Sequence, residues 1–270
     1  MKIVIEPGRA AAHYWRDLWR YRELMYFLAW RDILVRYKQT AIGVAWAIIR
    51  PAITMLVFVA FRRLVDVPAT GVPEPVLVFA AVLPWQFFST ALTESSASLV
   101  GNASLISKVY FPRILVPAAA VATAFADFLV TFALLAVLML WYGVAPGWPM
   151  LALPFFILLA SSLALGLGLF MAALNVEYRD FRYVVPFIVQ VGLFVSPIAF
   201  TTANMPEGWR ALYVLNPLVG IIDGFRWSIL GPQSPLDPRG VGMSVVVTAA
   251  VLVLGVWYFR RMERGFADVI

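Results

Sequence analysis

Arg50, Glu94 and Asp127 are charged side chains that interrupt long apolar runs of this 270-residue sequence. A charge at the centre of a membrane helix costs about 2.5–3.5 kcal/mol on insertion scales, so each group must face protein, water or a polar ligand. Glu94 and Asp127 are candidate ion-pair partners for Arg50. The sequence leaves two roles open for Arg50: a structural ion pair or interfacial anchor, and a contact with an anionic substrate group.

Several residue types and motifs that catalysis commonly uses are scarce or missing in this sequence. It has no cysteine and a single histidine, His13, which excludes thiol catalysis and leaves no plausible zinc or iron site. No Gly-Lys pair occurs, so the chain has no phosphate-binding P-loop. We therefore predict no catalytic residue, no metal ligand and no cofactor in this chain.

The composition is that of a membrane protein. Hydrophobic residues make up 62% of the chain and charged residues 13%, and the mean hydropathy is +0.85. A soluble domain has about a quarter of its residues charged, and a membrane-spanning helix needs about 20 apolar residues. The apolar windows predict an all-α integral membrane protein with six spans, near 41–61, 76–97, 114–142, 150–174, 184–201 and 241–259.

Lysine and arginine are distributed unequally between the segments that connect these spans. If both termini face the cytoplasm, the inner segments carry 15 Lys and Arg and the outer segments carry 5. The positive-inside rule expects this excess. Because the basic residues are scattered over several segments, the net charge of +6 indicates membrane topology and not nucleic-acid binding.

Residues 12–30 have the pattern of an amphipathic helix. Aromatic side chains share one face, whereas Arg16 and Arg20 lie on the other, as in a helix that rests in the headgroup plane of a membrane. The helix is either an anchor alone or an anchor whose polar face also docks a cytoplasmic partner.

Residues 203–232 are too irregular to form a span. Two short helical patterns are separated here by Asn216-Pro217, and each reaches only about half of the bilayer. We expect a re-entrant hairpin that enters from the outer side. Its aromatic residues, which include Trp209 and Tyr213, are alternatively ordinary interfacial anchors.

The segment 102–117, NASLISKVYFPRILVP, places two basic residues around a short Val-Tyr-Phe core. We expect Ala103–Tyr110 to form about two helical turns between the second and third spans, with Asn102 or Ser104 as the N-cap. The aliphatic and aromatic tip at 109–111 suits a pocket in another protein. The alternative is a loop helix that only covers the base of the bundle.

Polar and aromatic side chains recur at helical spacing along several of the predicted spans. Such patterns indicate either hydrogen bonding between helices or a hydrated path lined by aromatic side chains. The candidates for the path are Trp46, Arg50, Trp85, Gln86, Tyr183, Phe187, Gln190 and Phe194.

Five successive motifs of the chain resemble those of one family. They read TAIGVAWAIIRPAITMLVF, LPWQFFSTAL, NASLISKVYFPRILVP, LNVEYRDFRYVVPF and LYVLNPLVGIIDGFRW. In this order they look like the ABC-type polysaccharide and polyol-phosphate export permeases, the membrane subunits that export lipid-linked O-antigen, capsule or teichoic acid chains. The similarity extends over nearly the whole chain, from residue 20 to residue 260.

The resemblance implies a homodimer of six-span subunits that sits on two copies of a separate ABC ATPase, in the inner (plasma) membrane of a bacterium and in contact with its lipids. The ATPases would bind ATP and magnesium. The N-terminal helix and the loop after the second span would contact the ATPases. The residues to which this coupling role is assigned are Arg16, Arg20, Ser104, Leu105, Ile106, Lys108, Tyr110 and Phe111.

The family also has short re-entrant helices between its fifth and sixth spans, which matches the hairpin predicted around Asn216-Pro217. One position departs from the family pattern, because Arg50 replaces an uncharged polar residue before the proline of the first span. We expect a cytoplasmic N-terminal segment, 1–40, followed by one membrane domain, 41–270.

The resemblance implies that the chain is the permease of an ATP-driven exporter of lipid-linked polysaccharide. An ABC exporter of small lipids or drugs is the alternative with the same architecture, and a secondary carrier is a third. A membrane-embedded glycosyl- or acyltransferase would need catalytic acids or a histidine clustered at one membrane face, and the sequence shows no such cluster.

Overall fold

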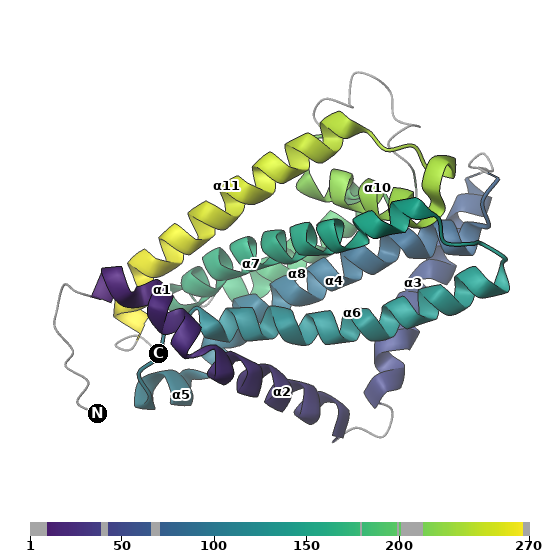
Figure 1. The fold of residues 1–270 in the computed structure, drawn as a ribbon. Coiled ribbons are helices and arrows are strands. Elements are labelled where there is room, and N and C mark those ends of the chain that lie inside the picture. Colours follow the sequence, from purple (N-terminus) through teal and green to yellow (C-terminus); the bar gives the residue numbers. More distant parts are fainter. Residues whose placement is uncertain are drawn as a thin grey trace.

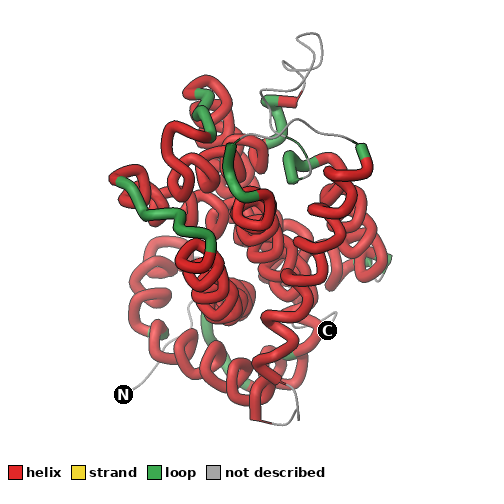
Figure 2. The backbone as a smooth tube through the Cα atoms, turned by 90° about the vertical axis from the view of Figure 1, so that its right-hand side faces the viewer, coloured by secondary structure: helices red, strands yellow, loops and turns green. Residues whose placement is uncertain are grey.

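The computed structural model describes residues 10–38, 43–65, 71–178, 180–198, 200 and 213–266. Within these ranges every regular element is a helix, and the loops that join them are short (Figures 1 and 2). Five helices are long and apolar enough to cross a membrane, and a sixth apolar helix is shorter. The prediction of an all-α membrane protein is confirmed.

The predicted spans correspond to six observed helices. The first five are α3 (Gly43–Leu64), α4 (Glu74–Gly101), α6 (Leu115–Trp141), α7 (Leu153–Glu177) and α8 (Phe181–Val195), and the last is α11 (Pro238–Met262). α4 is longer than expected at both ends. α8 has 15 residues and is therefore about 22 Å long, so it is the shortest of the six.

α4 is the central helix of the bundle. It packs against α3, α6, α7 and α8, and 83% of its most apolar window is buried, compared with 28% for α3 and 22% for α11. A buried aromatic cluster joins it to its neighbours, because the ring of Phe128 on α6 lies 5.3 Å from Phe87 on α4 and 6.1 Å from Phe225. The outer helices α3 and α11 keep wide apolar faces for lipid or for another subunit.

α7 and α11 approach each other closely through glycine. A Cβ atom at Gly255 would lie 2.1 Å from the carbonyl oxygen of Gly166, and one at Gly166 would lie 2.7 Å from the Cα of Leu252. Small residues at such a crossing let two backbones touch, which is how helices gain packing energy inside a membrane.

The N-terminal region differs from its prediction. The single helix expected over 12–30 is divided at Tyr21 into α1 (Ala10–Arg20) and α2 (Arg22–Lys38). α1 carries the amphipathic pattern, whereas α2 runs along α6 with Leu28 and Ala29 buried against it (Figure 1). The sequence pattern missed this division because no proline or glycine marks the turn at Tyr21.

The opposite end of the bundle holds a buried helix, α10 (Pro217–Leu230), and two short 3₁₀ helices, η1 (Trp148–Ala152) and η3 (Gly231–Gln233). Asn216 caps α10, since its side chain accepts a hydrogen bond from the backbone N–H of Leu218 at 3.0 Å, and Pro217 occupies the first turn. α10 is the second half of the predicted hairpin. The first half is expected at 208–216, and its residues before 213, Trp209 among them, lie outside the described residues.

Arg226 fixes α10 in this position. Its guanidinium is completely buried and donates to the carbonyl oxygens of Ile198 at 2.8 Å, Phe200 at 3.0 Å and Leu77 at 3.4 Å. Its ion-pair partner on the same helix is Asp223, at 3.6 Å. α10 is thereby tied both to the chain after α8 and to the first turn of α4.

Candidate functional site

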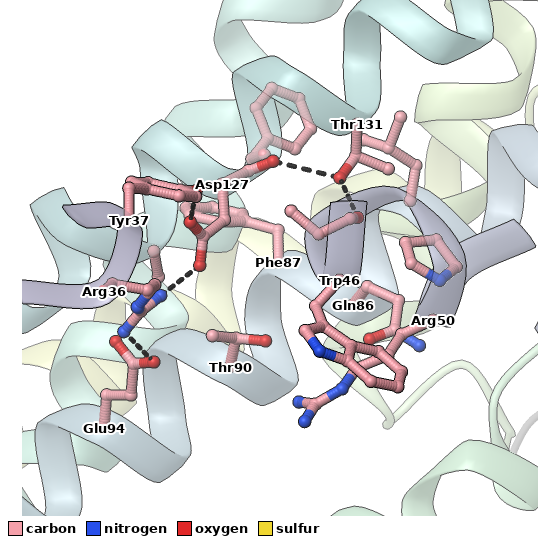
Figure 3. A pocket seen from close by; sticks show the side chains of 15 residues that line it. Arg36, Tyr37, Trp46, Arg50, Gln86, Phe87, Thr90, Glu94, Asp127 and Thr131 are labelled. Carbon is pink, nitrogen blue, oxygen red and sulfur yellow. Dashed lines mark hydrogen bonds and ion pairs between the residues drawn. The ribbon is translucent and has the colours of Figure 1, made fainter. Parts of the chain in front are cut away.

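A pocket of about 340 Å³ lies where α2, α3, α4 and α6 meet (Figure 3). Its wall combines aromatic rings with charged and hydroxyl-bearing side chains. The helices are joined across it by Thr131 of α6, whose hydroxyl lies 3.1 Å from the carbonyl oxygen of Ala47 on α3 and 3.0 Å from that of Asp127. Three of the predicted path residues line this pocket, namely Trp46, Arg50 and Gln86.

An ionic cluster closes one side of the pocket. The guanidinium of Arg36 donates to the carboxylates of both Glu94 and Asp127, and the hydroxyl of Tyr37 donates to Asp127 (Figure 3). Burial and the hydrogen bond to Asp127 raise the pKa of Tyr37, so its hydroxyl remains a donor at neutral pH. The cluster ties α2 to α4 and α6.

This cluster corrects the prediction about Arg50. Glu94 and Asp127 are the two carboxylates expected to pair with it, and both bond Arg36 instead. The guanidinium of Arg50 is exposed and lies over the ring of Trp46, 6.0 Å from its centroid. Among the described residues, no acidic side chain forms an ion pair with Arg50.

Gln86 and Trp85 are neighbours in the sequence but face different surroundings. The side-chain amide of Gln86 lies 3.4 Å from the hydroxyl of Thr54, at the pocket wall. Trp85 is only 3% exposed, and a Cβ atom at Gly192 of α8 would lie 2.7 Å from its ring. In this chain Trp85 therefore packs α4 against α8, which corrects its assignment to an open path.

α8 presents a second group of predicted path residues. Tyr183, Phe187 and Phe194 are 76%, 66% and 70% exposed, and Gln190 is also exposed. None of these four residues lines the pocket between α2, α3, α4 and α6. The structure thus divides the predicted path residues into a pocket group and an exposed α8 face.

The predicted coupling segment forms α5 (Ala103–Lys108), two residues shorter than expected. Neither predicted residue caps it through its side chain, because Asn102 instead donates to the carbonyl oxygen of Ser98 at 2.9 Å and accepts from Arg31 at 2.8 Å. Ser104 remains exposed at the start of the helix.

Burial divides the coupling residues into two kinds. Lys108 and Tyr110 are exposed and Leu105 is half-buried, but Ile106 and Phe111 are each only 4% exposed. The prediction of an exposed tip at 109–111 is therefore wrong for Phe111, since this ring anchors the segment in an apolar cluster with α2, α6, α7 and α11. On α1, Arg16 and Arg20 are exposed.

The end of α11 joins both predicted coupling elements, and the sequence reasoning missed this role. The carboxylate of Glu263 accepts from the backbone N–H of Arg113 at 2.7 Å, just before α6. Arg260 lies over the ring of Tyr14 on α1, 4.5 Å from its centroid. Burial of the Glu263 carboxyl group raises its pKa. This effect outweighs the hydrogen bond from Arg113, which lowers the pKa. α1, the segment after α5 and the end of α11 therefore meet at one end of the bundle (Figure 1).

Within the described ranges, no group of three or more histidine, aspartate or glutamate side chains is placed to hold a metal ion. The pocket residues offer hydrogen bonds, one exposed guanidinium and aromatic surface. They suit the binding of a polar or anionic group.

Comparison with known proteins gives relatives over nearly the full length. The chain is 29% identical to the O-antigen export system permease protein RfbA of Myxococcus xanthus, over 94% of this chain and 98% of that protein. It is 24% identical to RfbA of Klebsiella pneumoniae, over 92% and 95%. It is also 24% identical to the capsule polysaccharide export inner-membrane protein CtrC of Neisseria meningitidis, over 88% and 90%.

The profile of the ABC-2 type transporters matches residues 23–230, which include every helix from α3 to α10 and most of α2. The match thus covers the pocket, α5 and the buried helix at the far end of the bundle. The chain belongs to the ABC-2 type transporter family.

Proposed function

We propose that this chain is the transmembrane permease subunit of an ATP-driven exporter that moves lipid-linked polysaccharide across the inner membrane. The observation that carries the proposal is the correspondence, over nearly the full length of both chains, with permeases named for the export of O-antigen and capsule polysaccharide. The O-antigen permeases are the more similar relatives, so we take an O-antigen-like polymer as the first substrate to test. A teichoic-acid-like polymer is the alternative within this class.

The energy would come from a separate ABC ATPase, which binds ATP and magnesium. The end of the bundle that holds α1, α5 and the end of α11 is the proposed docking surface, and both termini are then cytoplasmic. Its exposed residues Arg16, Arg20, Lys108 and Tyr110 would contact the ATPase. Buried Phe111 would keep the docking segment attached to the bundle when the ATPase moves.

A homodimer would cover part of the surface that one chain leaves exposed. The face of α8 with Tyr183, Phe187 and Phe194 is strongly exposed, and α3 and α11 are mostly unburied along their length. In a dimer with two ATPases, exposed aromatic side chains of α8 would line a path for sugars, which aromatic rings bind through their faces. α10, held by Arg226, would lie at the outer end of this path.

The experiment is deletion of the gene in its host, followed by complementation. The expected result is loss of the surface polysaccharide and accumulation of its lipid-linked form inside the cell, with both restored by the intact gene. Restoration should fail when the partner ATPase carries an inactive nucleotide site, but should survive an uncoupler while ATP is maintained. Normal surface polysaccharide in the deletion strain, together with altered drug or phospholipid export, would favour the small-lipid exporter instead.

A further inference from the structure

The pocket between α2, α3, α4 and α6 contains two arginines in opposite electrostatic situations. Arg36 shares two carboxylates and is fully engaged with them. Arg50 has aromatic contact with Trp46 and no ion pair with any acidic residue in the described part of the chain. Figure 3 shows the Arg50 side chain extending beside Trp46, away from the Arg36 cluster. Within the part of the chain that the structure describes, Arg50 is therefore a pocket cation without an ion-pair partner.

The position of Arg50 makes this lack significant. It lies seven residues after the first residue of α3, about 10 Å along a membrane-spanning helix. A guanidinium keeps its charge under all ordinary conditions, and exposure of that charge to lipid is costly. An exposed Arg50 therefore requires water or an anion at the mouth of the pocket.

The surroundings of Arg50 suit a phosphate group that belongs to a larger amphiphilic molecule. The planar guanidinium binds two phosphate oxygens at once. Gln86 and Thr90 line the same pocket and supply further hydrogen-bonding groups, and the exposed ring of Trp46 offers a face for an adjoining sugar or isoprenoid. Because Arg36 holds both carboxylates on the other side, these acids have a partner of their own and do not need Arg50.

We propose that Arg50 binds a phosphate group at the mouth of this pocket, with Trp46 beside it, as the site where the phosphate of a lipid-linked glycan is held. The proposal rests on the proposed export function for the identity of the ligand. The same chemistry is offered by the phosphate of a membrane phospholipid, so the test must separate these two sources.

The test uses the complex of the permease with its ATPase in nanodiscs of phosphatidylcholine. Geranylgeranyl diphosphate serves as the probe, and geranylgeraniol, which lacks the phosphates, is its control. We expect the diphosphate to bind and the alcohol not to. Arg50→Gln should weaken diphosphate binding by about ten-fold or more, as expected for the loss of a charge-assisted hydrogen-bonded pair. Arg50→Lys should weaken binding by less, because the charge remains but the two-pronged contact is lost.

Arg63→Gln is the matched control, since Arg63 is an exposed arginine on the same helix that pairs with Glu74 at 3.2 Å, far from the pocket. It should leave diphosphate binding unchanged. If phosphatidylglycerol added to the nanodiscs displaces the probe at equal mole fraction, the phosphate bound at Arg50 comes from bulk lipid, and the assignment to a lipid-linked glycan is wrong. If it does not, the site prefers the polyprenyl diphosphate.

Unchanged diphosphate binding in Arg50→Gln overturns the proposal. If Arg50→Gln also lowers the thermal stability and Arg50→Lys restores it, while the natural protein and both variants bind the diphosphate equally, Arg50 is an interfacial anchor. Either result leaves the export function standing, since export is measured by surface polysaccharide in cells. Failure of the proposed export function would instead appear as normal surface polysaccharide in the deletion strain.

Discussion

Replacing Arg36 by methionine tests the ionic cluster that joins α2 to the bundle. Methionine keeps an unbranched apolar stem, although a shorter one, and removes the donor that Glu94 and Asp127 share. Breaking a buried pair by removing one partner costs about 3–5 kcal/mol, because the remaining charge is left without compensation. The side chains of Arg36, Glu94 and Asp127 are 31%, 28% and 21% exposed, so solvent offsets part of this cost. We therefore expect Arg36→Met to lower the free energy of unfolding by about 1–3 kcal/mol.

The assay is thermal unfolding of the purified complex in one detergent. Arg31→Met is the control from the same helix, since its ion pair with Asp32 and its hydrogen bond to Asn102 are both exposed and should together contribute about 0–1 kcal/mol. The triple variant that also carries Glu94→Gln and Asp127→Asn should regain most of the lost stability, because no unpaired charge remains. Equal melting temperatures for Arg36→Met and the natural protein would refute the reasoning and show that water in the pocket solvates both acids.

Three further predictions concern packing and coupling. Tyr110→Ala should lower transport-coupled ATPase activity and leave the yield of the complex unchanged. Phe111→Ala should lower the yield, because deletion of a buried ring costs about 3–5 kcal/mol. Equal yields for the two variants would contradict the assigned burial. Gly255→Ala should destabilise the bundle by about 1–3 kcal/mol through overpacking, while Gly242→Ala, which has open space around it, should not; unfolding in detergent compares the two. Glu263→Gln should reduce transport per ATP hydrolysed, because the hydrogen bond from the Arg113 N–H weakens when its acceptor loses its charge. An unchanged ratio of transport to ATP hydrolysis would mean that this carboxylate has no part in coupling.

The spans could be predicted from the sequence because the requirement they satisfy is local. A helix that crosses the hydrocarbon core needs a continuous apolar run of sufficient length, and this property belongs to each segment alone. For the same reason α5 was found from its position between two spans, and the start of α10 from Asn216-Pro217. The resemblance to export permeases added the family, which the match to the ABC-2 type transporters and the export permeases among the relatives confirm.

Which arginine pairs with Glu94 and Asp127 could not be predicted in this way. Arg36 lies 58 residues from Glu94 and 91 residues from Asp127. Only the packing of α2 against α4 and α6 shows that Arg36, and not Arg50, bonds both carboxylates. The sequence offers two arginines of equal chemistry to the same two acids. The geometry of the folded chain decided between them.

The sequence by itself determined the class of protein, the approximate bounds of its spans and the uneven distribution of positive charge, because each depends on side-chain type over a short window. Only the tertiary structure decided which adjacent residues face outward. Tyr110 is 61% exposed and Phe111 4%, although both are aromatic and consecutive. Burial depends on which helices surround a position, and that neighbourhood is assembled from segments far apart in the chain.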